Sequence, residues 1–346
     1  GSLAWLDVDG SLQVGPRSAG ATPGPAAYGL GGTEPTVTDA NVVLGRIGTT
    51  RRLGGSITID AGRARAAVAA LAARLGTLTL DALAEGILRI AVARMTSAIR
   101  EISIQRGHDP RDFTLVAFGG AGPMHALALA DEIGIPRVLV PRHPGNFSAL
   151  GLLASDIKHD EVRTRVGPLR ERWSVLPALF AEMEGGVRRQ LELEGFEAAR
   201  QRMRRSLDLR YRSQAFELNL EPGDAPLGDV ETAFHERHLA MYGHADPTAP
   251  IELVNARLSA YGVVARPAAA HHRGAATGLD AALIERRPVR FDGAAHDCPV
   301  WERERLPADA ELRGPAIVEE FGATTVVPPG WRGTVDVHGN LRLERA

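Results

Sequence analysis

The chain has 346 residues, 44% of them apolar and 24% charged, which is enough to bury a core and to form two domains. Its 40 basic and 42 acidic residues give a formal net charge of −2, so no overall positive field would attract nucleic acid. The single cysteine, Cys298, excludes an internal disulfide and a cysteine-based metal site, which predicts a cytoplasmic protein. No apolar run reaches the roughly 20 residues that a membrane helix needs, so we expect no membrane partner.

The N-terminal part of the chain is predicted to form a sheet edge followed by two helices. Residues 1–55 are rich in Gly, Pro and Thr and contain only short apolar strands. Between Arg63 and Leu75, Ala, Val and Leu recur at helical spacing, and a longer apolar stripe begins after Thr79. Thr79 can cap this second, long helix, and Gly107 can end it.

A glycine-rich turn follows the second helix. Residues 114–117 suit a buried strand, residues 119–122 are Gly-Gly-Ala-Gly, and Pro123 suits the first turn of a helix that ends near 133. With a second strand at 137–140, this is a right-handed parallel unit whose turn lies at the C-terminal end of a strand, where ligands bind. The spacing is neither GxxxxGK[ST] nor GxGxxG, and by itself such a turn can be no more than a tight connection.

The remainder of the chain is predicted to form a short helix and then a second domain. The short helix covers residues 149–154, and charged residues with a Gly-Pro pair at 163–170 indicate a domain boundary. Apolar periodicity then predicts, in order, a helix at 173–194, strands at 203–211 and 215–220, a helix at 229–241 and a strand at 252–262. Short strands at 289–291, 316–319, 324–327, 333–337 and 341–343, separated by Pro and Gly, predict a small antiparallel sheet or barrel.

Three long segments carry a family resemblance. They are Gly32–Arg46, which contains Pro-Thr-Val-Thr-Asp-Ala-Asn, the glycine turn, and Pro144–Gly151. Shorter segments, among them Tyr211–Gln214 and Gly314–Trp331, follow in the same order. On these residues the chain resembles the A subunit of the hydantoinase and oxoprolinase family. The resemblance implies an ATP-dependent enzyme that opens cyclic amides such as 5-oxoproline or hydantoins, and related carboxylases exist in the same superfamily.

The chain also departs from the family. Members carry two phosphate-binding segments of the Asp-x-Gly-Gly-Thr type upstream of the Pro-Thr-Val-Thr-Asp-Ala-Asn motif, and neither occurs here. We therefore expect the C-terminal portion of a longer or split protein of α/β class. Residues 1–165 would form the C-terminal part of an actin-like (ribonuclease H-like) ATPase core, and residues 166–346 an accessory α+β domain with the small antiparallel sheet.

The resemblance also implies cofactors, partners and site residues. ATP and magnesium would be the cofactors, and the partners would be the missing N-terminal half, a B-type subunit and a small cyclic amide. Gly119, Gly120 and Gly122 would lie against the adenosine, and His125 would donate to a phosphate or to the base, or simply fill space. Asp39 could hold a magnesium-bound water or substrate, or it could cap the helix that begins near Asn41.

Other polar residues are weaker candidates. His235, His238, His244 and Asp246 resemble metal ligands, but the two helical histidines are three residues apart, not four as in HExxH, which favours a hydrogen-bonding role. Glu319 and Glu320 could form a functional carboxylate pair, or they could line a sheet edge, since no base or nucleophile signature accompanies them. His271 and His272 lie in a segment without a pattern and are expected to be solvated.

These expectations define three functional hypotheses. The first is an enzyme that transfers a phosphoryl group to a cyclic amide and then opens the ring. This chain would form part of that enzyme and would be inactive alone. The second is a subunit of an ATP-dependent ketone carboxylase. The third is a non-catalytic assembly module that docks a B-type subunit and retains a vestigial glycine turn.

Overall fold

The computed structural model describes residues 1–76, 78–266 and 278–346 and divides them into two compact units. Unit 1 comprises residues 1–151 together with the described C-terminal residues from 278 onward, and unit 2 comprises residues 152–266. This division differs from the boundary expected at residue 165, because the C-terminal strands pack with residues of unit 1. The expectation for His271 and His272 falls outside the described residues.

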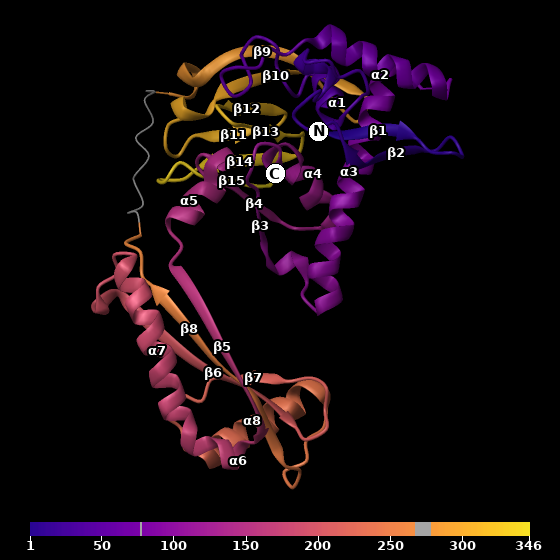
Figure 1. Ribbon diagram of the computed structural model, residues 1–346. Coiled ribbons are helices and arrows are strands. Elements are labelled where there is room, and N and C mark those ends of the chain that lie inside the picture. Colours follow the sequence, from indigo (N-terminus) through magenta and orange to yellow (C-terminus); the bar gives the residue numbers. More distant parts are fainter. Residues whose placement is uncertain (77, 267–277) are drawn as a thin grey trace. The chain divides into compact units, whose positions relative to one another are not determined.

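Unit 1 contains two mixed sheets and five helices among its described residues (Figure 1). Its first part forms β1 (Ser2–Leu6), β2 (Leu12–Ser18), α1 (Val37–Val43), α2 (Ala61–Leu75), α3 (Leu80–Ile102), β3 (Thr114–Val116), α4 (Gly122–Ile133), β4 (Arg137–Val140) and α5 (Phe147–Leu153), whose last two residues are assigned to unit 2. Its C-terminal part forms β9 (Leu283–Phe291), β10 (Ala294–Glu302), β11 (Glu311–Arg313), β12 (Ala316–Glu320), β13 (Ala323–Val327), β14 (Trp331–Val335) and β15 (Leu341–Arg345).

The two predicted N-terminal helices and the Thr79 cap are confirmed, but α3 ends at Ile102, before the predicted end at Gly107. The Asp60 side chain accepts a hydrogen bond from the Arg63 N–H at the start of α2, and Thr79 accepts one from the Ala82 N–H at the start of α3. Their apolar faces pack in one cluster with α1 and the β1–β2 hairpin. No single helix in the described ranges is long and apolar enough to cross a membrane, although the segments Ala61–Leu75 and Leu80–Arg106 pass that test as a bent pair.

The parallel pairing of the predicted unit is also confirmed, but its sheet is larger than expected. β3 is not the buried strand that the sequence predicts, because it is an edge strand on which Thr114 and Val116 are exposed. β3 and β4 run parallel with α4 between them in the chain, and β4 pairs on its other side with β15 in antiparallel register. Val138 lies opposite Leu343 and Val140 lies opposite Leu341, which gives the strand order β11-β14-β15-β4-β3. The separate small antiparallel sheet expected for the C-terminal strands is therefore wrong, because two of them, β14 and β15, extend the sheet of the glycine turn together with β11, which the sequence does not predict.

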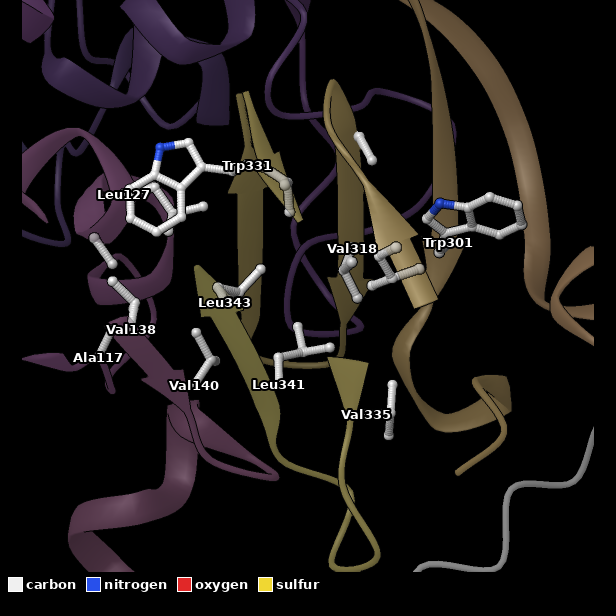
Figure 2. Packing of buried hydrophobic residues seen from close by; sticks show 14 of the residues in the cluster. Ala117, Leu127, Val138, Val140, Trp301, Val318, Trp331, Val335, Leu341 and Leu343 are labelled. Atoms are coloured by element: carbon white, nitrogen blue, oxygen red, sulfur yellow. The ribbon is translucent and has the colours of Figure 1, made fainter. Parts of the chain in front are cut away.

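The other C-terminal strands form a second sheet, of order β13-β12-β10-β9. β10 and β12 are parallel, and the remaining pairs are antiparallel. The sequence does not predict β10, because Asp297 and Pro299 interrupt its apolar pattern. A hydrophobic cluster joins the two sheets and α4. In Figure 2, Trp331 lies beside Leu127 of α4, and Val318 and Trp301 enter the cluster from the second sheet.

Unit 2 is an antiparallel sheet with helices on it (Figure 1). It contains β5 (Ile157–Pro168), α6 (Leu169–Arg172), α7 (Leu176–Leu193), β6 (Gln201–Tyr211), β7 (Leu218–Leu220), α8 (Leu227–Tyr242) and β8 (Ile251–Gly262), and its strand order is β5-β8-β6-β7. The helices α7 and α8 and all strands except β5 agree with the sequence prediction within a few residues, whereas the short helix α6 is not predicted. β5 lies where the sequence indicates a boundary, because it is mostly exposed and therefore charged.

We expect Leu341→Ala to lower the free energy of unfolding of unit 1 by about 3 kcal/mol, because the buried Leu341 side chain packs where β15 meets β4. Hydrogen exchange measured by mass spectrometry should accelerate in β4 and β14 and stay unchanged in β6 and β8. Leu193→Ala is the matched control, since that side chain is 90% exposed. Faster exchange throughout unit 2 would contradict the division of the chain into these units.

Candidate functional site

The glycine turn lies at the C-terminal ends of the two parallel strands, as the sequence predicts. The Ala117 N–H donates to the Leu139 carbonyl at 2.8 Å, and the Gly119 N–H donates to the Pro144 carbonyl at 2.7 Å. These bonds hold the turn after β3 against the turn after β4. Gly119 has φ +83°, and a Cβ added to it would meet no atom within 4 Å, so its glycine is required by backbone conformation and not by crowding.

A third turn, between β12 and β13, packs on the other two. A Cβ added to Gly120 would lie 3.1 Å from the Gly322 carbonyl oxygen, and one added to Gly145 would lie 3.0 Å from the same atom. The close approach of these backbones therefore favours glycine at both positions, since a side chain would force the Gly322 carbonyl to move. The sequence does not single out Gly322, since a Phe-Gly pair between two strands indicates only a turn. Phe118 and Phe321 leave 47% and 69% of their surfaces exposed on these turns.

The start of α4 is open to an anion or a polar ring. Ala121 is the N-cap and makes no side-chain cap, so the first N–H groups of this 12-residue helix have no capping side chain. A Cβ on Gly122 would come no closer than 3.8 Å to its nearest neighbour, which is an ordinary contact. Packing within the protein therefore does not require glycine at this position. A ligand that approached the backbone closely would require it.

His125, near the start of α4, lines a pocket of about 510 Å³ between α3, α4 and the β9–β10 hairpin. Its ring is 7% exposed, and burial, with a smaller contribution from the nearby Arg46, lowers its pKa to about 4. The imidazole is therefore neutral at physiological pH and brings no positive charge to a phosphate. This geometry supports the alternative that His125 fills space beside the turn.

Asp39 lies at the third position of α1, where it is fully buried. Its carboxylate accepts hydrogen bonds from the Ala27 N–H at 2.7 Å, the Thr36 N–H at 2.9 Å and the Thr36 hydroxyl at 2.7 Å, with a longer one from Ala26. Thr36 in turn caps the helix, which begins at Val37 and not near Asn41. The geometry thus supports the capping alternative for Asp39, because protein donors surround its oxygens.

The end of the same motif is held by Arg287 of β9. Its guanidinium donates to the Gly45 carbonyl at 2.9 Å and to the Glu319 carboxylate at 2.8 Å. A Cβ on Gly45 would lie 2.3 Å from the Pro288 carbonyl oxygen, and one on Gly48 would lie 2.3 Å from the guanidinium. Glu319 therefore belongs to an ion pair that positions the loop after α1, a role that sequence spacing does not reveal.

Glu320 differs from its neighbour, because it has no ion-pair partner within 4 Å among the described residues. It lines a pocket of about 460 Å³ between residues 47–55 and the β12–β13 hairpin. Its Oε1 atom is buried and makes no hydrogen bond to any described residue. Burial raises the pKa of Glu320 to about 7, although the positive charge of Arg303 opposes this shift.

The histidines of unit 2 make hydrogen bonds, as the sequence favours. The His235 ring nitrogen lies 2.7 Å from the Tyr211 hydroxyl. His238 is buried and lies 2.7 Å from the His244 carbonyl oxygen and 3.3 Å from the Gln214 side-chain oxygen. In the described ranges, no group of three or more His, Cys, Asp or Glu side chains could hold a metal ion.

Comparison with known proteins identifies the family of this chain. Two sequence models cover almost the whole chain: Hydantoinase/oxoprolinase matches residues 1–161, and the Hydantoinase/oxoprolinase C-terminal domain matches residues 169–346. The chain belongs to the hydantoinase/oxoprolinase family. The resemblance predicted from the sequence is thereby confirmed.

Individual family members are similar over the full chain. The caprolactamase subunit alpha of Pseudomonas jessenii is 37% identical, over 99% of this chain and 51% of that protein. The acetophenone carboxylase gamma subunit of Aromatoleum aromaticum is 35% identical, over 99% of this chain and 49% of that protein. The chain thus spans about half the length of these relatives.

Two solved structures of the family superimpose on the whole chain. The ATP-dependent caprolactamase of Pseudomonas jessenii matches with a TM-score of 0.79 and 35% identity, over 52% of its chain. Nucleotide-free acetone carboxylase matches with a TM-score of 0.86 and 24% identity, over 51% of its chain, and shows the fold alone. The α/β class with several sheets is therefore shared with both.

We expect Asp39→Asn to lower the free energy of unfolding by about 2 to 3 kcal/mol. The NH2 group of asparagine cannot accept a hydrogen bond, so it would leave at least one buried donor that now bonds to the carboxylate without an acceptor. Urea unfolding measures this loss, with the exposed Asp9→Asn as the control. An unchanged stability together with lost magnesium-dependent nucleotide binding would favour the metal-related alternative.

Glu320→Gln should change how stability depends on pH. The pKa of Glu320 is higher in the folded state than its ordinary value of 4.5, so the wild type loses stability as pH rises from about 4.5 through about 7. The stability of the variant relative to wild type should therefore increase by about 2 kcal/mol between pH 5 and pH 8. Urea unfolding at the two pH values tests this, and an equal difference at both would contradict the buried-carboxyl assignment.

Proposed function

We propose that this chain forms the adenosine-binding side of an ATP-dependent enzyme that opens cyclic amides, the rest of the longer protein supplying the phosphate-binding segments. One observation carries the proposal. The Gly119–Gly122 turn is exposed at the ends of two parallel strands, in a chain 37% identical to a caprolactamase alpha subunit. Relatives named 5-oxoprolinase, such as one from Arabidopsis thaliana at 29% identity, favour the same substrate class.

The residues of the three turns fit a nucleotide. Gly119 and Gly122 leave space for a ring to approach the backbone, and the uncapped N–H groups of α4 favour negative charge. ATP, when bound, would supply a phosphoryl group to the amide oxygen, which makes the carbonyl carbon more susceptible to attack by water. The role of this chain is to position the nucleotide, because positioning and charge neutralisation dominate such reactions.

Magnesium would accompany ATP, but the described residues do not include a cluster of carboxylates and histidines that could hold it. Asp39 is enclosed by protein donors and does not fit a metal-ligand role in this arrangement. We therefore place the magnesium ligands on the nucleotide phosphates and on the upstream half. On this proposal the isolated chain binds nucleotide weakly and does not hydrolyse it.

The partners follow from the same comparison. Relatives of this chain are named as alpha, beta or gamma subunits, so the family includes multi-subunit enzymes. We propose that this chain also works with a B-type subunit, in the cytoplasm.

A ketone carboxylase is the second candidate, favoured by the 35% identity to an acetophenone carboxylase subunit. Product analysis of the assembled enzyme separates the two activities. Incubation with ATP and a cyclic amide should give the ring-opened amino acid, whereas incubation with ATP, bicarbonate and a ketone should give no β-keto acid. The reverse result would establish the carboxylase instead.

The nucleotide site is tested by a matched pair of glycine substitutions. Gly119 and Gly107 have φ values of +83° and +81° and open space around a Cβ, so Gly119→Ala and Gly107→Ala should each cost about 1 kcal/mol of stability. Only Gly119→Ala should weaken ATP and ADP binding, by about tenfold or more, in calorimetric titrations with magnesium. Wild-type binding should tighten when the separately expressed upstream half is added.

Equal nucleotide affinity in the two variants would show that the glycine turn is not part of the nucleotide site. The assembly-module alternative would be favoured if the wild type bound no nucleotide with or without the upstream half while the two pieces associated.

A further inference from the structure

The pocket that contains Glu320 adjoins the proposed nucleotide turn. Glu320 and Phe321 line this pocket, and the next residue, Gly322, packs its carbonyl against Gly120 and Gly145. One side of the β12–β13 turn therefore contacts the glycine turn. Glu320, Phe321 and Thr324 of the same β12–β13 hairpin line the pocket. A small molecule in the pocket would lie close to the turn at which we place the nucleotide.

The pocket has apolar and polar walls. Ile47 and Leu53 line it from the loop after α1, and Phe321 lines it from the hairpin, where 69% of the Phe321 surface is exposed. A ring of a few carbon atoms can pack against such side chains. Thr324 of β13 adds a hydroxyl group, and Glu320 adds a carboxyl group.

One oxygen of the Glu320 carboxyl group has no hydrogen-bond partner among the described residues. Its Oε1 atom is buried and makes no hydrogen bond to any described residue, which leaves a polar atom unsatisfied. Because the terminal torsion of glutamate has a broad minimum and no hydrogen bond holds Oε1, the group can turn to present both oxygens to the pocket. In its protonated form it offers one O–H donor and one carbonyl acceptor side by side.

We propose that the pocket is the cyclic-amide subsite and that Glu320 recognises the cis-amide edge of the ring. A lactam is held in the cis form, so its carbonyl and its N–H lie on one edge. The Glu320 O–H would donate to the lactam carbonyl, and the other Glu320 oxygen would accept from the lactam N–H. The choice of ligand rests on the proposed function, whereas the site rests on the geometry of the pocket.

This pairing distinguishes substrate classes. A ketone has no N–H and would leave the second oxygen of Glu320 without a hydrogen-bond donor. A site built to bond an N–H rejects analogues that lack it much more strongly than a purely apolar pocket rejects a change in size. Glu320 would thereby favour a cyclic amide over a ketone of the same shape.

The charges around Glu320 allow the neutral form. Arg303, which is 4% exposed, favours the carboxylate, whereas Glu304 and above all burial favour the protonated acid. Three further charged residues of the pocket wall are already paired: Arg51 and Glu302 lie 2.7 Å from each other, and Glu319 lies 2.8 Å from Arg287. Within the described residues Arg52, also on the wall, has no ion pair, and it is exposed to solvent.

The test measures the binding of 2-pyrrolidinone, N-methyl-2-pyrrolidinone and cyclopentanone to the whole chain. Ligand-observed NMR gives the affinity of each compound from pH 6 to pH 8. Wild-type affinity for 2-pyrrolidinone should fall about tenfold over this range, since a group with pKa near 7 loses most of its proton there. The N-methyl lactam and the ketone should bind at least about fivefold more weakly than 2-pyrrolidinone at pH 6.

Variants separate recognition from a structural role. Glu320→Gln should keep lactam affinity within about threefold and lose the pH dependence, because a primary amide offers the same donor and acceptor at every pH. Glu320→Leu should lose about tenfold or more in affinity. Arg52→Gln is the control and should behave as the wild type, because Arg52 lies on the same pocket wall and is exposed to solvent.

Equal binding of lactam and ketone, or lactam binding that is independent of pH in the wild type, would overturn the role of Glu320. The same holds if the wild type does not bind any lactam. Since the pH series uses the wild-type chain, the test does not depend on the folding of a variant. Ring opening by the assembled enzyme with unchanged kinetics in Glu320→Leu would overturn this inference and leave the proposed function standing.

Discussion

The pairing of β15 with β4 is the constraint on which unit 1 depends. It joins the last strand of the chain to the parallel unit of the glycine turn, and Leu341 and Leu343 pack there against Val140 and Val138. The hairpin β12–β13 belongs to the second sheet, and the shared hydrophobic cluster places it beside the strand ends. Without this pairing, Gly322 could not contact Gly120 and Gly145, because their positions are far apart in the sequence.

Polar residues in unit 1 perform two kinds of task. Asp39, Thr36 and Arg287 use their hydrogen-bonding groups on backbone or neighbouring side chains, and they stabilise the start of α1 and the loop after it. Glu320 retains an unsatisfied oxygen in a pocket. Because leaving a buried polar atom without a partner costs free energy, such an atom is a better indication of ligand binding than a satisfied carboxylate in a family motif.

The two proposed subsites share one short segment. Glu320 contributes to the pocket and Gly322, two residues later, contributes to the packing of the glycine turn. A phosphoryl transfer between a nucleotide and an amide needs the two reactants to lie close together in a fixed orientation. A tight hairpin is suited to this, since its backbone geometry fixes the separation of the groups on its two sides.

The sequence alone determined the local structure and the family. Thr79 and the apolar stripe after it specify α3, and the strand, glycines and Pro123 specify the turn before α4, because caps and periodicity depend on near neighbours. The family followed from the order of its motifs. The tertiary structure decided which polar residues remain available: it enclosed Asp39 and His125 and left Glu320 facing a pocket. It also decided the pairing of β15 with β4, because strand pairing and burial depend on residues distant in the chain, which a local pattern does not contain.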